Sequence, residues 1–557
     1  MASSSRHCVE KCVRRKCFSV FSVKKNVKTA FHQPSSALLF SGMNGTMPVA
    51  GETIPELLRK AKAAWNVHNF QLGLEAMTQA HQLDPANVPI LLDLGLMHGL
   101  RYDYAGASRY FDEAARVAPF KAEAFAAAGM RCHQFPNLQM AALYFERAIT
   151  EPGVPGEILI ELADAYERQH KLTEAAVFLE RALKAKPDYP SALLVQARLH
   201  RRDGKLEEAE KLLLSFLGKP DCKPATYIEG WYELGGVYDR QKRYDDAMTA
   251  FLNAKSLQLP YAKGATEQLQ RMQQRAATLQ KELTRDDFRR WREYGKSLST
   301  PRRFALLCGF PRSGTTLLEQ IMDSHPQIIS AEETRILQEE ACRPLRRTSP
   351  PGTPPKIMLD SVSLPKLQQF RDDYFRSVDL FLGQPVGDRL LIDKNPSFNN
   401  LITDIIRVIP EAKFIAALRD PRDVCMSCFM QSLPLNAISS SFLTLDGTAT
   451  QYASSMGLWR FVAAEMSNPN IEVRYEDVVE NLEAQARRVL EFLEVPWVDD
   501  VLRFNEHAQK KTVMSPTYAD VAKPVFKTAV GRWRNYEKYF EPHLEKLNPF
   551  LKAFGYE

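Results

Sequence analysis

The 557-residue sequence contains no apolar run long enough to cross a bilayer, which takes about 20 residues. We therefore expect no transmembrane helix. Cysteine is also scarce, because the chain has only nine, an odd number scattered over its whole length. A sparse set of this kind indicates free thiols in a reducing compartment rather than a disulfide framework, so we expect a cytoplasmic protein.

One pair of cysteines has the C-x-x-C spacing that metal and redox sites use, namely Cys425 and Cys428. No second cysteine pair or histidine pair completes a zinc set, and both residues fall in a helical pattern. We therefore expect them to pack a helix, and the sequence predicts no metal.

A strong charge of one sign is missing from most of the chain. The net charge is +6, but residues 1–50 carry about +7, since eight Lys and Arg stand there against Glu10 alone. The remaining residues sum to about −1. Such a balance gives no general reason to expect a nucleic-acid partner.

Residues 1–50 are basic, contain serine and are almost free of acid, so we expect a disordered leader. Two other interpretations are open. The composition resembles that of an organellar transit peptide. Alternatively the start codon lies upstream of the natural one, because Met43 and Met47 stand just before the ordered pattern.

Small residues recur every 34 positions from residue 73 onward, and a second series with the same step follows seven positions later. The two series are Gly73, Ala107, Ala141, Ala175 and Ala209, and Ala80, Ala114, Ala148 and Ala182. Small side chains let two helix backbones approach closely, and prolines near the end of each unit, such as Pro85 and Pro119, end the second helix.

The period and the pattern resemble tetratricopeptide repeats. We count five regular units over residues 57–225 and a looser sixth around Ala247, Phe251 and Ala254. One such unit cannot bury its apolar face alone, so the units must stack into an α-solenoid. We expect the array to span residues 51–263. Its face binds a protein partner or the substrate in one interpretation, and it supports the next domain in the other.

A helical cap and linker is expected at residues 264–300, and the 34-residue rhythm then ends. From Phe304 short β-like runs alternate with helical patterns, which indicates a parallel α/β sheet in a domain over residues 301–557. The expected strands are 304–308, 328–330, 390–392, 413–418 and 471–475. The proline- and arginine-rich stretch 343–356 reads as an exposed loop.

The first of these strands leads into G-F-P-R-S-G-T-T, residues 309–316, and a helical pattern follows. A strand, a glycine-containing loop and a helix start hold phosphate through backbone N–H groups and the helix dipole. Thr315 stands where a P-loop has the lysine that serves phosphoryl transfer with Mg²⁺. The loop therefore predicts a phosphate site that needs no triphosphate and no metal, and the alternative is an ordinary turn.

Charged residues follow three other strands, and ligands of open α/β sheets bind at such strand ends. Arg419, with Ser427 eight residues later, could hold a second phosphate. The alternative for Arg419 is an ion pair with Asp423. Glu333 and Lys394 follow the second and third strands. The alternative for Glu333 is a helix-start carboxylate, and the alternative for Lys394 is a pair with Asp393 or a nearby acid.

Together these segments resemble the sulfotransferases that use 3′-phosphoadenosine-5′-phosphosulfate (PAPS). Within them the chain is similar to tyrosylprotein sulfotransferases and to bacterial proteins that fuse tetratricopeptide repeats to the same domain. The shared segments are P-R-S-G-T-T, E-E-T-R, K-N-P, R-D-P-R with its later serine, R-Y-E-D, and K-P-V before Trp533. The resemblance runs over about residues 304–540 and implies a P-loop-like α/β fold with a parallel sheet.

The resemblance also implies residue roles. The residues that would grip the 5′-phosphosulfate are Arg312, Ser313, Gly314, Thr315 and Thr316. Those that would hold the 3′-phosphate and adenine are Arg419, Ser427, Tyr475 and Arg532, the last standing where the tyrosylprotein enzymes have lysine. Glu333 would be the catalytic base, Lys394 and Arg312 would stabilise the bridging oxygen, and Thr517 would assist.

The implied function is transfer of a sulfuryl group from PAPS to a hydroxyl acceptor, with the repeats as a binding module. Tyrosylprotein enzymes carry a second basic residue four positions after the arginine of E-E-T-R, where this chain has Glu339. An acidic peptide is therefore in doubt, and a protein tyrosine, a small molecule, a lipid and a glycan all stay open as acceptors. The alternatives are a repeat scaffold with a degenerate catalytic domain, and a P-loop kinase or NTPase, which Thr315 disfavours.

Overall fold

The computed structural model describes residues 52–556 apart from 136, 153, 155, 219–222, 300 and 511–528. The leader and Thr517 therefore lie outside the described residues. Within them no helix is long and apolar enough to cross a membrane.

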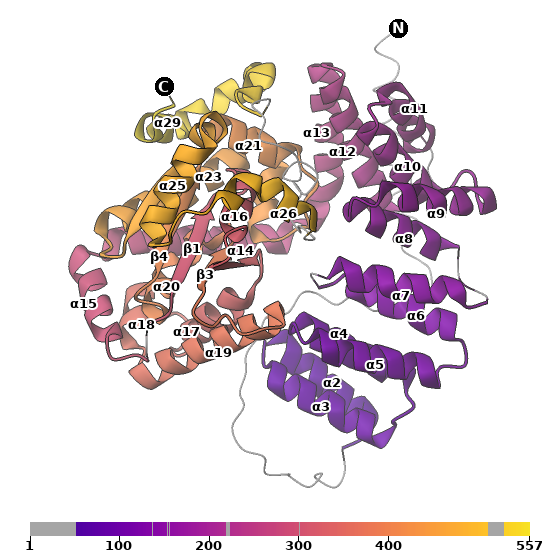
Figure 1. Ribbon diagram of the computed structural model, residues 1–557, viewed down its shortest axis with the longest axis horizontal. Helices are drawn as coiled ribbons and strands as arrows, with labels where there is room; N and C mark the ends of the chain where they lie inside the picture. The colour runs from indigo at the N-terminus through magenta and orange to yellow at the C-terminus, as the bar shows by residue number, and fades with distance from the viewer. Residues whose placement is uncertain are drawn as a thin grey trace.

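The first half of the chain is an arc of paired helices (Figure 1). The pairs are α2 (Ile54–Asn66) with α3 (Phe70–Leu83), α4 (Val88–Leu100) with α5 (Tyr104–Val117), α6 (Lys121–Cys132) with α7 (Leu138–Thr150), α8 (Glu157–Arg168) with α9 (Leu172–Ala185), α10 (Pro190–Arg202) with α11 (Leu206–Leu217), and α12 (Pro224–Arg240) with α13 (Tyr244–Gln258). The predicted solenoid is confirmed, and the small residues of the repeat are buried between its helices.

Close packing explains why α4 and α6 carry a glycine where they contact their partner helices. A Cβ atom added to Gly95 would lie 2.3 Å from the Phe111 ring, and one added to Gly129 would lie 2.4 Å from the Phe145 ring. In these two pairs the first helix thus leaves room for an aromatic ring of the second. Any larger residue would push the two helices apart.

The turns inside four of the helix pairs place one residue in the left-handed region, and the spacings between these residues are multiples of 34. His68, Tyr102, His170 and Gly204 have φ angles of 63°, 65°, 63° and 79°. Glycine adopts this conformation freely, whereas other residues are strained there by about 1 kcal/mol or more. His68 and Tyr102 therefore occupy positions that favour glycine.

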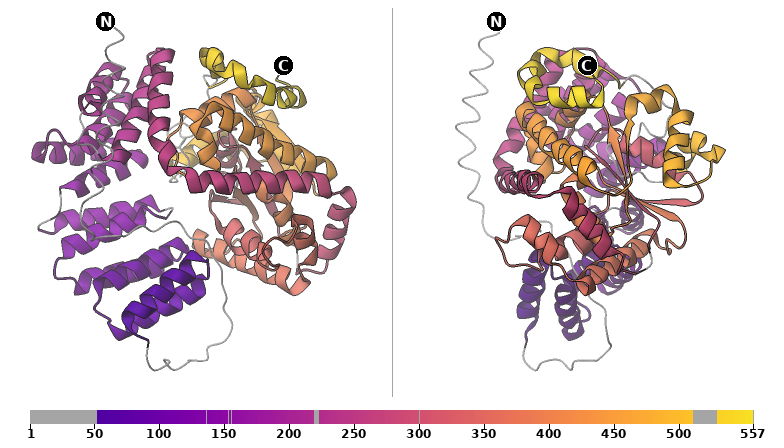
Figure 2. Two further views of the ribbon diagram at one scale, coloured as in Figure 1. Left: turned by 180° about the vertical axis from the view of Figure 1, so that it is seen from behind. Right: turned by 90° about the vertical axis from the view of Figure 1, so that its left-hand side faces the viewer.

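Two helices join the repeats to the second domain, α14 (Lys263–Glu282) and α15 (Arg285–Gly295). In the view from behind, α14 runs across the face of the second domain (Figure 2). Ala276 and Leu279 of α14 share one hydrophobic core with Phe251 of the sixth repeat and Phe304 of the first strand. The cap is thus packed against both domains.

The second domain is built on a five-stranded parallel sheet in the order β2-β3-β1-β4-β5. The strands are β1 (Phe304–Gly309), β2 (Ile328–Glu332), β3 (Leu390–Lys394), β4 (Lys413–Leu418) and β5 (Asn470–Arg474). The fold class and the five strands predicted from the sequence are confirmed. The last strand ends one residue early, since Tyr475 begins a helix instead.

Helices cover both faces of the sheet, and successive strand residues point to opposite faces. One face packs on α16 (Thr315–Asp323), α25 (Leu482–Leu493) and α26 (Phe504–Lys510). The other packs on α19 (Leu364–Leu382), α20 (Ile402–Val408), α21 (Pro421–Met430) and α23 (Leu445–Glu465). Shorter elements are η2 (Leu337–Cys342), α17 (Arg343–Arg346), α18 (Pro355–Ser361), η3 (Phe398–Leu401), α22 (Ala437–Ser440), η4 (Ser441–Leu443), α24 (Tyr475–Glu480), η5 (Asp499–Arg503), η6 (Arg532–Tyr536), α28 (Glu537–Phe540), η7 (Glu541–Lys546) and α29 (Asn548–Phe554), with η1 (Leu259–Tyr261) before α14.

The sixth repeat is bonded to the C-terminal segment of the second domain. Asp239 of α12 accepts hydrogen bonds from Arg532 and from the Tyr536 hydroxyl. Asp245 of α13 does the same for Lys538 and Tyr539 at 2.8 Å. The late end of the array is therefore fixed to the domain that follows it.

The expectation of an exposed loop over 343–356 is wrong at both ends. Residues 343–346 form α17 with Leu345 buried, and Pro355 begins α18. Proline is favoured in the first turn of a helix, and Pro344 and Pro355 occupy such positions in α17 and α18. Arg346 leaves the surface because its Nε bonds Asp404 at 2.8 Å.

Asp404 joins three elements and supplies a stability prediction. Its buried carboxylate on α20 accepts from Arg346 and, at 3.2 Å, from Arg275 of α14. Burial opposes ionisation, but the two guanidinium groups prevail and hold the pKa of Asp404 below its usual value. We expect Asp404→Asn to lower the free energy of unfolding by about 3 kcal/mol, since it breaks a buried ion pair.

Chemical denaturation at two pH values checks this effect. Because the folded pKa lies below the unfolded one, the contribution of Asp404 is complete above about pH 4 and is lost as the pH falls through the folded value. The gap between wild type and Asp404→Asn should therefore close in acid. The control is Asp93→Asn. It breaks a partly exposed pair with Arg131 and should lower the free energy of unfolding by less than about 1 kcal/mol. Equal losses in the two variants would contradict the prediction.

Candidate functional site

The glycine-containing loop follows β1, the central strand of the sheet. The strands that come next in the chain, β2 and β3, lie on one side of β1, and β4 and β5 lie on the other. Crevices at such switch points are the usual ligand sites of open α/β sheets. Left-handed backbone occurs at Gly309, Arg312 and Gly314, with φ angles of 141°, 71° and 92°. A Cβ atom on Gly309 would lie 2.4 Å from the Ala417 carbonyl, and one on Gly314 would lie 2.7 Å from the Tyr475 ring. The loop therefore requires glycine at both positions.

The loop ends at the N-terminus of α16. Ser313 donates from Oγ to the Phe310 carbonyl at 2.7 Å, and this bond closes the loop on itself. Thr315 and Thr316 are buried in the first turn of the helix. The first amides of a helix have no partner within it and point along the positive end of its dipole. An anion is the ligand that this arrangement suits best.

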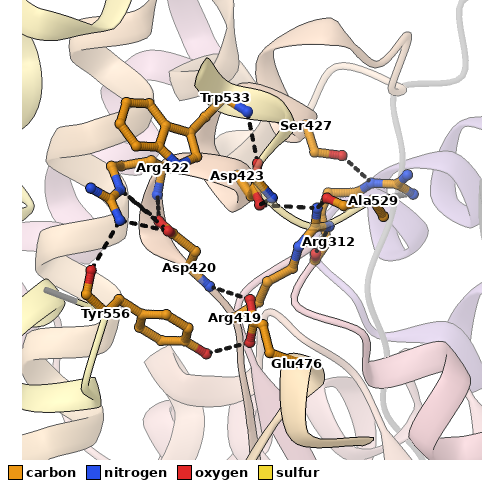
Figure 3. A network of polar contacts seen from close by, with 11 residues as sticks. Arg312, Arg419, Asp420, Arg422, Asp423, Ser427, Glu476, Ala529, Trp533 and Tyr556 are labelled. Carbon is orange, nitrogen blue, oxygen red and sulfur yellow. Dashed lines mark hydrogen bonds and ion pairs between the residues drawn. The ribbon is translucent and has the colours of Figure 1, made fainter. Parts of the chain in front are cut away.

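Two arginines and a serine from three elements meet beside the loop (Figure 3). Arg312 donates from Nε to Ser427 Oγ on α21 at 3.0 Å. Arg419, at the end of β4, donates to the Arg312 carbonyl at 3.2 Å and lies over the Tyr475 ring, 5.1 Å from its centre. The structure thus brings together Arg312, Arg419, Ser427 and Tyr475, as the second-phosphate prediction requires.

Arg419 has a donor left over. Its Nε is buried and has no hydrogen-bond partner in the part of the chain that the structure describes. The alternative ion pair with Asp423 is also present, at 3.7 Å. An orphaned buried donor next to a second arginine is a position where another acceptor, such as a phosphate oxygen, fits.

The remaining residues of the R-D-P-R-D motif hold the site together rather than face it (Figure 3). Asp423 accepts from the backbone N–H groups of Gly531 and Trp533 at 2.6 and 2.8 Å. The backbone N–H of Asp420 donates to Glu476 at 3.1 Å. These bonds fix the C-terminal segment over α21. Within that segment Arg532 turns to Asp239 of the repeats, and its contact with a cofactor stays a prediction.

On the other side of the loop, a buried lysine stands among three carboxylates. Lys394 Nζ lies 2.8 Å from Glu333, 3.4 Å from Glu332 and 3.6 Å from Glu319, and it is 3.4 Å from the Thr316 hydroxyl. Burial alone would lower the pKa of Lys394, but the carboxylates outweigh it and raise that pKa well above its usual value. Lys394 is therefore a fixed cation at the start of α16.

Of the three carboxylates, Glu333 is the one that solvent reaches, with 30% of its side chain exposed against 4% for Glu332 and none for Glu319. The alternative for Lys394 is also present, since it pairs with nearby acids. It does not pair with Asp393, because neighbouring strand residues face opposite ways. Asp393 instead accepts from the Tyr374 hydroxyl at 2.8 Å, and burial raises the pKa of Asp393 to about 7.

The turn that carries Glu333 is strained and tied to β3. Glu333 has a φ angle of 49°. Its backbone N–H donates to the Lys394 carbonyl at 2.8 Å, and Asn395 donates from Nδ2 to the Thr334 carbonyl at 3.2 Å. Strained non-glycine residues persist where several contacts define them, and they cluster at functional sites.

Sequence reasoning missed Glu319 and Glu332. Glu319 stands three residues after Thr316 in the helix and so shares its face, which is a signal the sequence offers. Glu332 is adjacent to Glu333, and only the structure shows which of the two carboxylates is exposed. Among the described residues no group of His, Cys, Asp or Glu is arranged to hold a metal ion.

Comparison with known proteins agrees with this geometry. A model described as "Sulfotransferase family" matches residues 305–499, and two models described as "Tetratricopeptide repeat" match residues 160–224 and 228–259. The second domain is a sulfotransferase domain. The glycine-containing loop, Glu333, Lys394 and Arg419 all lie inside its matched range.

Relatives of the sulfotransferase domain include "Protein-tyrosine sulfotransferase 1" of Danio rerio, 26% identical over 47% of this chain and 76% of that protein. "Protein-tyrosine sulfotransferase A" of Caenorhabditis elegans is 25% identical over 46% of this chain and 67% of that protein. An uncharacterised Aquifex aeolicus protein is 25% identical over 65% of this chain, and the match spans 47% of that protein, about half its length. The solved sulfotransferase domain of a Synechococcus olefin synthase is 19% identical over 43% of this chain and 89% of that one, and its TM-score of 0.31 is too low to carry an argument.

Proposed function

We propose that the sulfotransferase domain transfers a sulfuryl group from PAPS to a hydroxyl acceptor. The observation that carries the proposal is the contact of Lys394 with both Glu333 and the first turn of α16. It joins a permanent cation and a solvent-exposed carboxylate to the anion-binding end of a helix. A sulfuryl transfer from a phosphosulfate needs these three groups in one place.

The residues around the loop fit the donor. We propose that residues 312–316 hold its 5′-phosphosulfate, and that Arg419, Ser427 and Tyr475 hold its 3′-phosphate and adenine. The orphaned Arg419 Nε and the two glycines that keep the loop open to a close approach support this assignment. We assign Thr517 and Arg532 supporting roles on the resemblance alone.

The chain supplies positioned charge and a proton acceptor. PAPS, when bound, provides a sulfuryl group that is activated by its bond to a phosphate oxygen. Lys394 and Arg312 stabilise negative charge on that oxygen, and a well-placed group of this kind contributes about 3–4 kcal/mol. Glu333 takes the proton of the acceptor hydroxyl, which contributes about 10²- to 10⁴-fold. Glu319 and Glu332 keep Lys394 charged and in place.

The acceptor is proposed as a hydroxyl, with a tyrosine of a protein as the first class to test because the named relatives are protein-tyrosine sulfotransferases. A phenol, with a pKa of about 10, needs less help from a base than an aliphatic alcohol does. Glu339 does not add a free negative charge to the site, since it pairs with Arg343 at 3.0 Å. The repeats are proposed as a module that binds a protein partner or the substrate.

Thermal unfolding with added nucleotides tests the donor site. We expect adenosine 3′,5′-bisphosphate to stabilise the protein by about 2.7 kcal/mol at about 100 times its Kd. ATP with Mg²⁺ should not match this effect. Arg419→Ala should lose the stabilisation, whereas Arg460→Ala, which alters an exposed arginine of α23, should keep it. Stabilisation by ATP with Mg²⁺ alone would overturn the proposal.

A transfer assay with labelled PAPS on protein and small-molecule extracts then identifies the acceptor class. Label on a protein tyrosine supports the first class, and label on a lipid, glycan or small molecule replaces it. A chain that binds the bisphosphate but transfers no label to any extract would be a repeat scaffold with a degenerate site.

A further inference from the structure

The second repeat touches the segment that carries Glu333. The Arg335 backbone N–H, two residues after Glu333, donates to the hydroxyl of Tyr102 at 3.1 Å. The Tyr102 ring packs edge-on against Phe381 of α19, with 5.4 Å between ring centres. One residue of the repeat array thus contacts both α19 and residues 333–346, which are called the base segment below.

A buried ion pair stands beside this bond. Arg101 bonds Glu340 of η2 at 2.5 Å, and only 1% of the Glu340 side chain is exposed. Burial raises the pKa of Glu340, and Arg101 opposes that shift. The other Glu340 oxygen, Oε2, has no hydrogen-bond partner among the described residues. Arg101 is therefore the group that makes an ionised Glu340 tolerable in this position.

The first repeat adds a third contact to the same stretch, since His68 accepts a hydrogen bond at Nε2 from Arg343 at 2.6 Å. His68 and Tyr102 are equivalent residues of successive repeats, both strained in the left-handed region. In the fifth repeat that position is Gly204, which is free of strain. His170 of the fourth repeat shares the conformation. At His68 and Tyr102 the side chain at this position also contacts the stretch that follows Glu333.

The base segment has a need for such support. Glu333 is strained, and the bonds from the end of β3 hold the Glu333 N–H and the Thr334 carbonyl. The Arg335 N–H begins the helical stretch 336–346 and so has no acceptor within it. That stretch includes η2, a π-helix, and π-helical turns are frequent at functional sites. Tyr102 supplies the missing acceptor.

We propose that Tyr102 and Arg101 are positioning residues of the sulfotransferase site, which makes the repeat array a structural part of that site. This inference rests on the proposed role of Glu333 as the base. Tyr102 holds the backbone two residues after Glu333, and Arg101 holds the helical stretch that follows. The array then acts on the proton-transfer step as well as on whatever it binds.

Tyr102→Phe removes the hydroxyl alone and is the main test. We expect kcat to fall by about 10- to 100-fold, because a displacement of about 1 Å at a reacting group costs up to about 10² in rate. Binding of adenosine 3′,5′-bisphosphate and the KM for PAPS should stay at the wild-type values. The control is Tyr144→Phe, whose hydroxyl bonds Ser108 and Asp112 within the array and should leave kcat unchanged.

Arg101 offers a graded test. Arg101→Ala should lower kcat, and Arg101→Lys should restore part of the loss because it returns a cation to Glu340. Arg131→Ala, which removes a repeat arginine paired with Asp93, is the matched control and should have no effect on kcat. A loss of kcat as large in Arg131→Ala as in Arg101→Ala would overturn the proposal, since it would mark general destabilisation of the repeats.

Hydrogen exchange of the Arg335 amide gives a readout that does not depend on activity. We expect faster exchange in Tyr102→Phe than in wild type or Tyr144→Phe. If Tyr102→Phe leaves both exchange and kcat at the wild-type values, the positioning role is wrong. If the wild type transfers no sulfuryl group although Arg335 exchange responds to Tyr102→Phe, the proposed function fails, whereas the contact itself stands.

Discussion

Glu333→Gln is expected to lower kcat by about 10²- to 10⁴-fold, the usual contribution of a general base. Glutamine keeps an oxygen that can face Lys394 at the 2.8 Å contact of the wild type, but it cannot take a proton. Binding of adenosine 3′,5′-bisphosphate should not change, because Glu333 lies on the β2 side of the loop and Arg419 on the β4 side. Transfer of label from saturating PAPS measures the loss.

Glu332→Gln is the control for this experiment. Glu332 lies 3.4 Å from Lys394, and only 4% of its side chain is exposed, so an acceptor hydroxyl cannot reach it from solvent. We expect a small loss in this variant. Full activity in Glu333→Gln together with a large loss in Glu332→Gln would contradict the prediction, because it would identify Glu332 as the base.

Lys394→Met is expected to damage both stability and turnover. It takes the Lys394 ammonium away from the buried carboxylates of Glu319 and Glu332, and breaking a buried ionic cluster in this way costs about 3–5 kcal/mol of stability. It also removes a group that stabilises the bridging oxygen, worth about 10²- to 10³-fold in rate. Chemical denaturation and turnover well below the melting temperature measure the two losses separately.

A compensated variant separates folding from catalysis. Adding Glu319→Gln and Glu332→Gln to Lys394→Met removes the two buried carboxylate charges that faced the Lys394 ammonium in the wild type. We expect the triple variant to regain most of the stability and none of the turnover. Recovery of both would mean that Lys394 acts only through folding, and recovery of neither would mean that the cluster is not the source of the instability.

Much of the site could be predicted because it is built from strand ends. A parallel sheet brings the residues after β1, β2, β3 and β4 to one edge whatever the loops do, so Arg312, Glu333, Lys394 and Arg419 had to converge. The repeats were predictable for a similar reason, since a 34-residue period leaves few ways to pack. Local pattern and topology decide both.

Contacts between distant segments could not be predicted. Tyr102 and Arg335 are 233 positions apart, and no periodicity relates them. Arg346 looked like a residue of an exposed loop because the buried carboxylate that pairs with it, Asp404 of α20, lies 58 positions further along the chain. The neighbours Asp393 and Lys394 face opposite sides of the sheet, so the obvious local pair does not form.

The arc of repeats is bonded to the sulfotransferase domain at both ends, through Tyr102 and Arg101 early and through Asp239 and Asp245 late. Open solenoids fray from their terminal repeats, where each unit has a single neighbour. Here fraying of the first two repeats would release the turn that carries Glu333. Warming should therefore slow the proposed proton transfer before the domain releases the donor. The upper temperature for the proposed activity is then set by the stability of helices that lie far from the sulfuryl group.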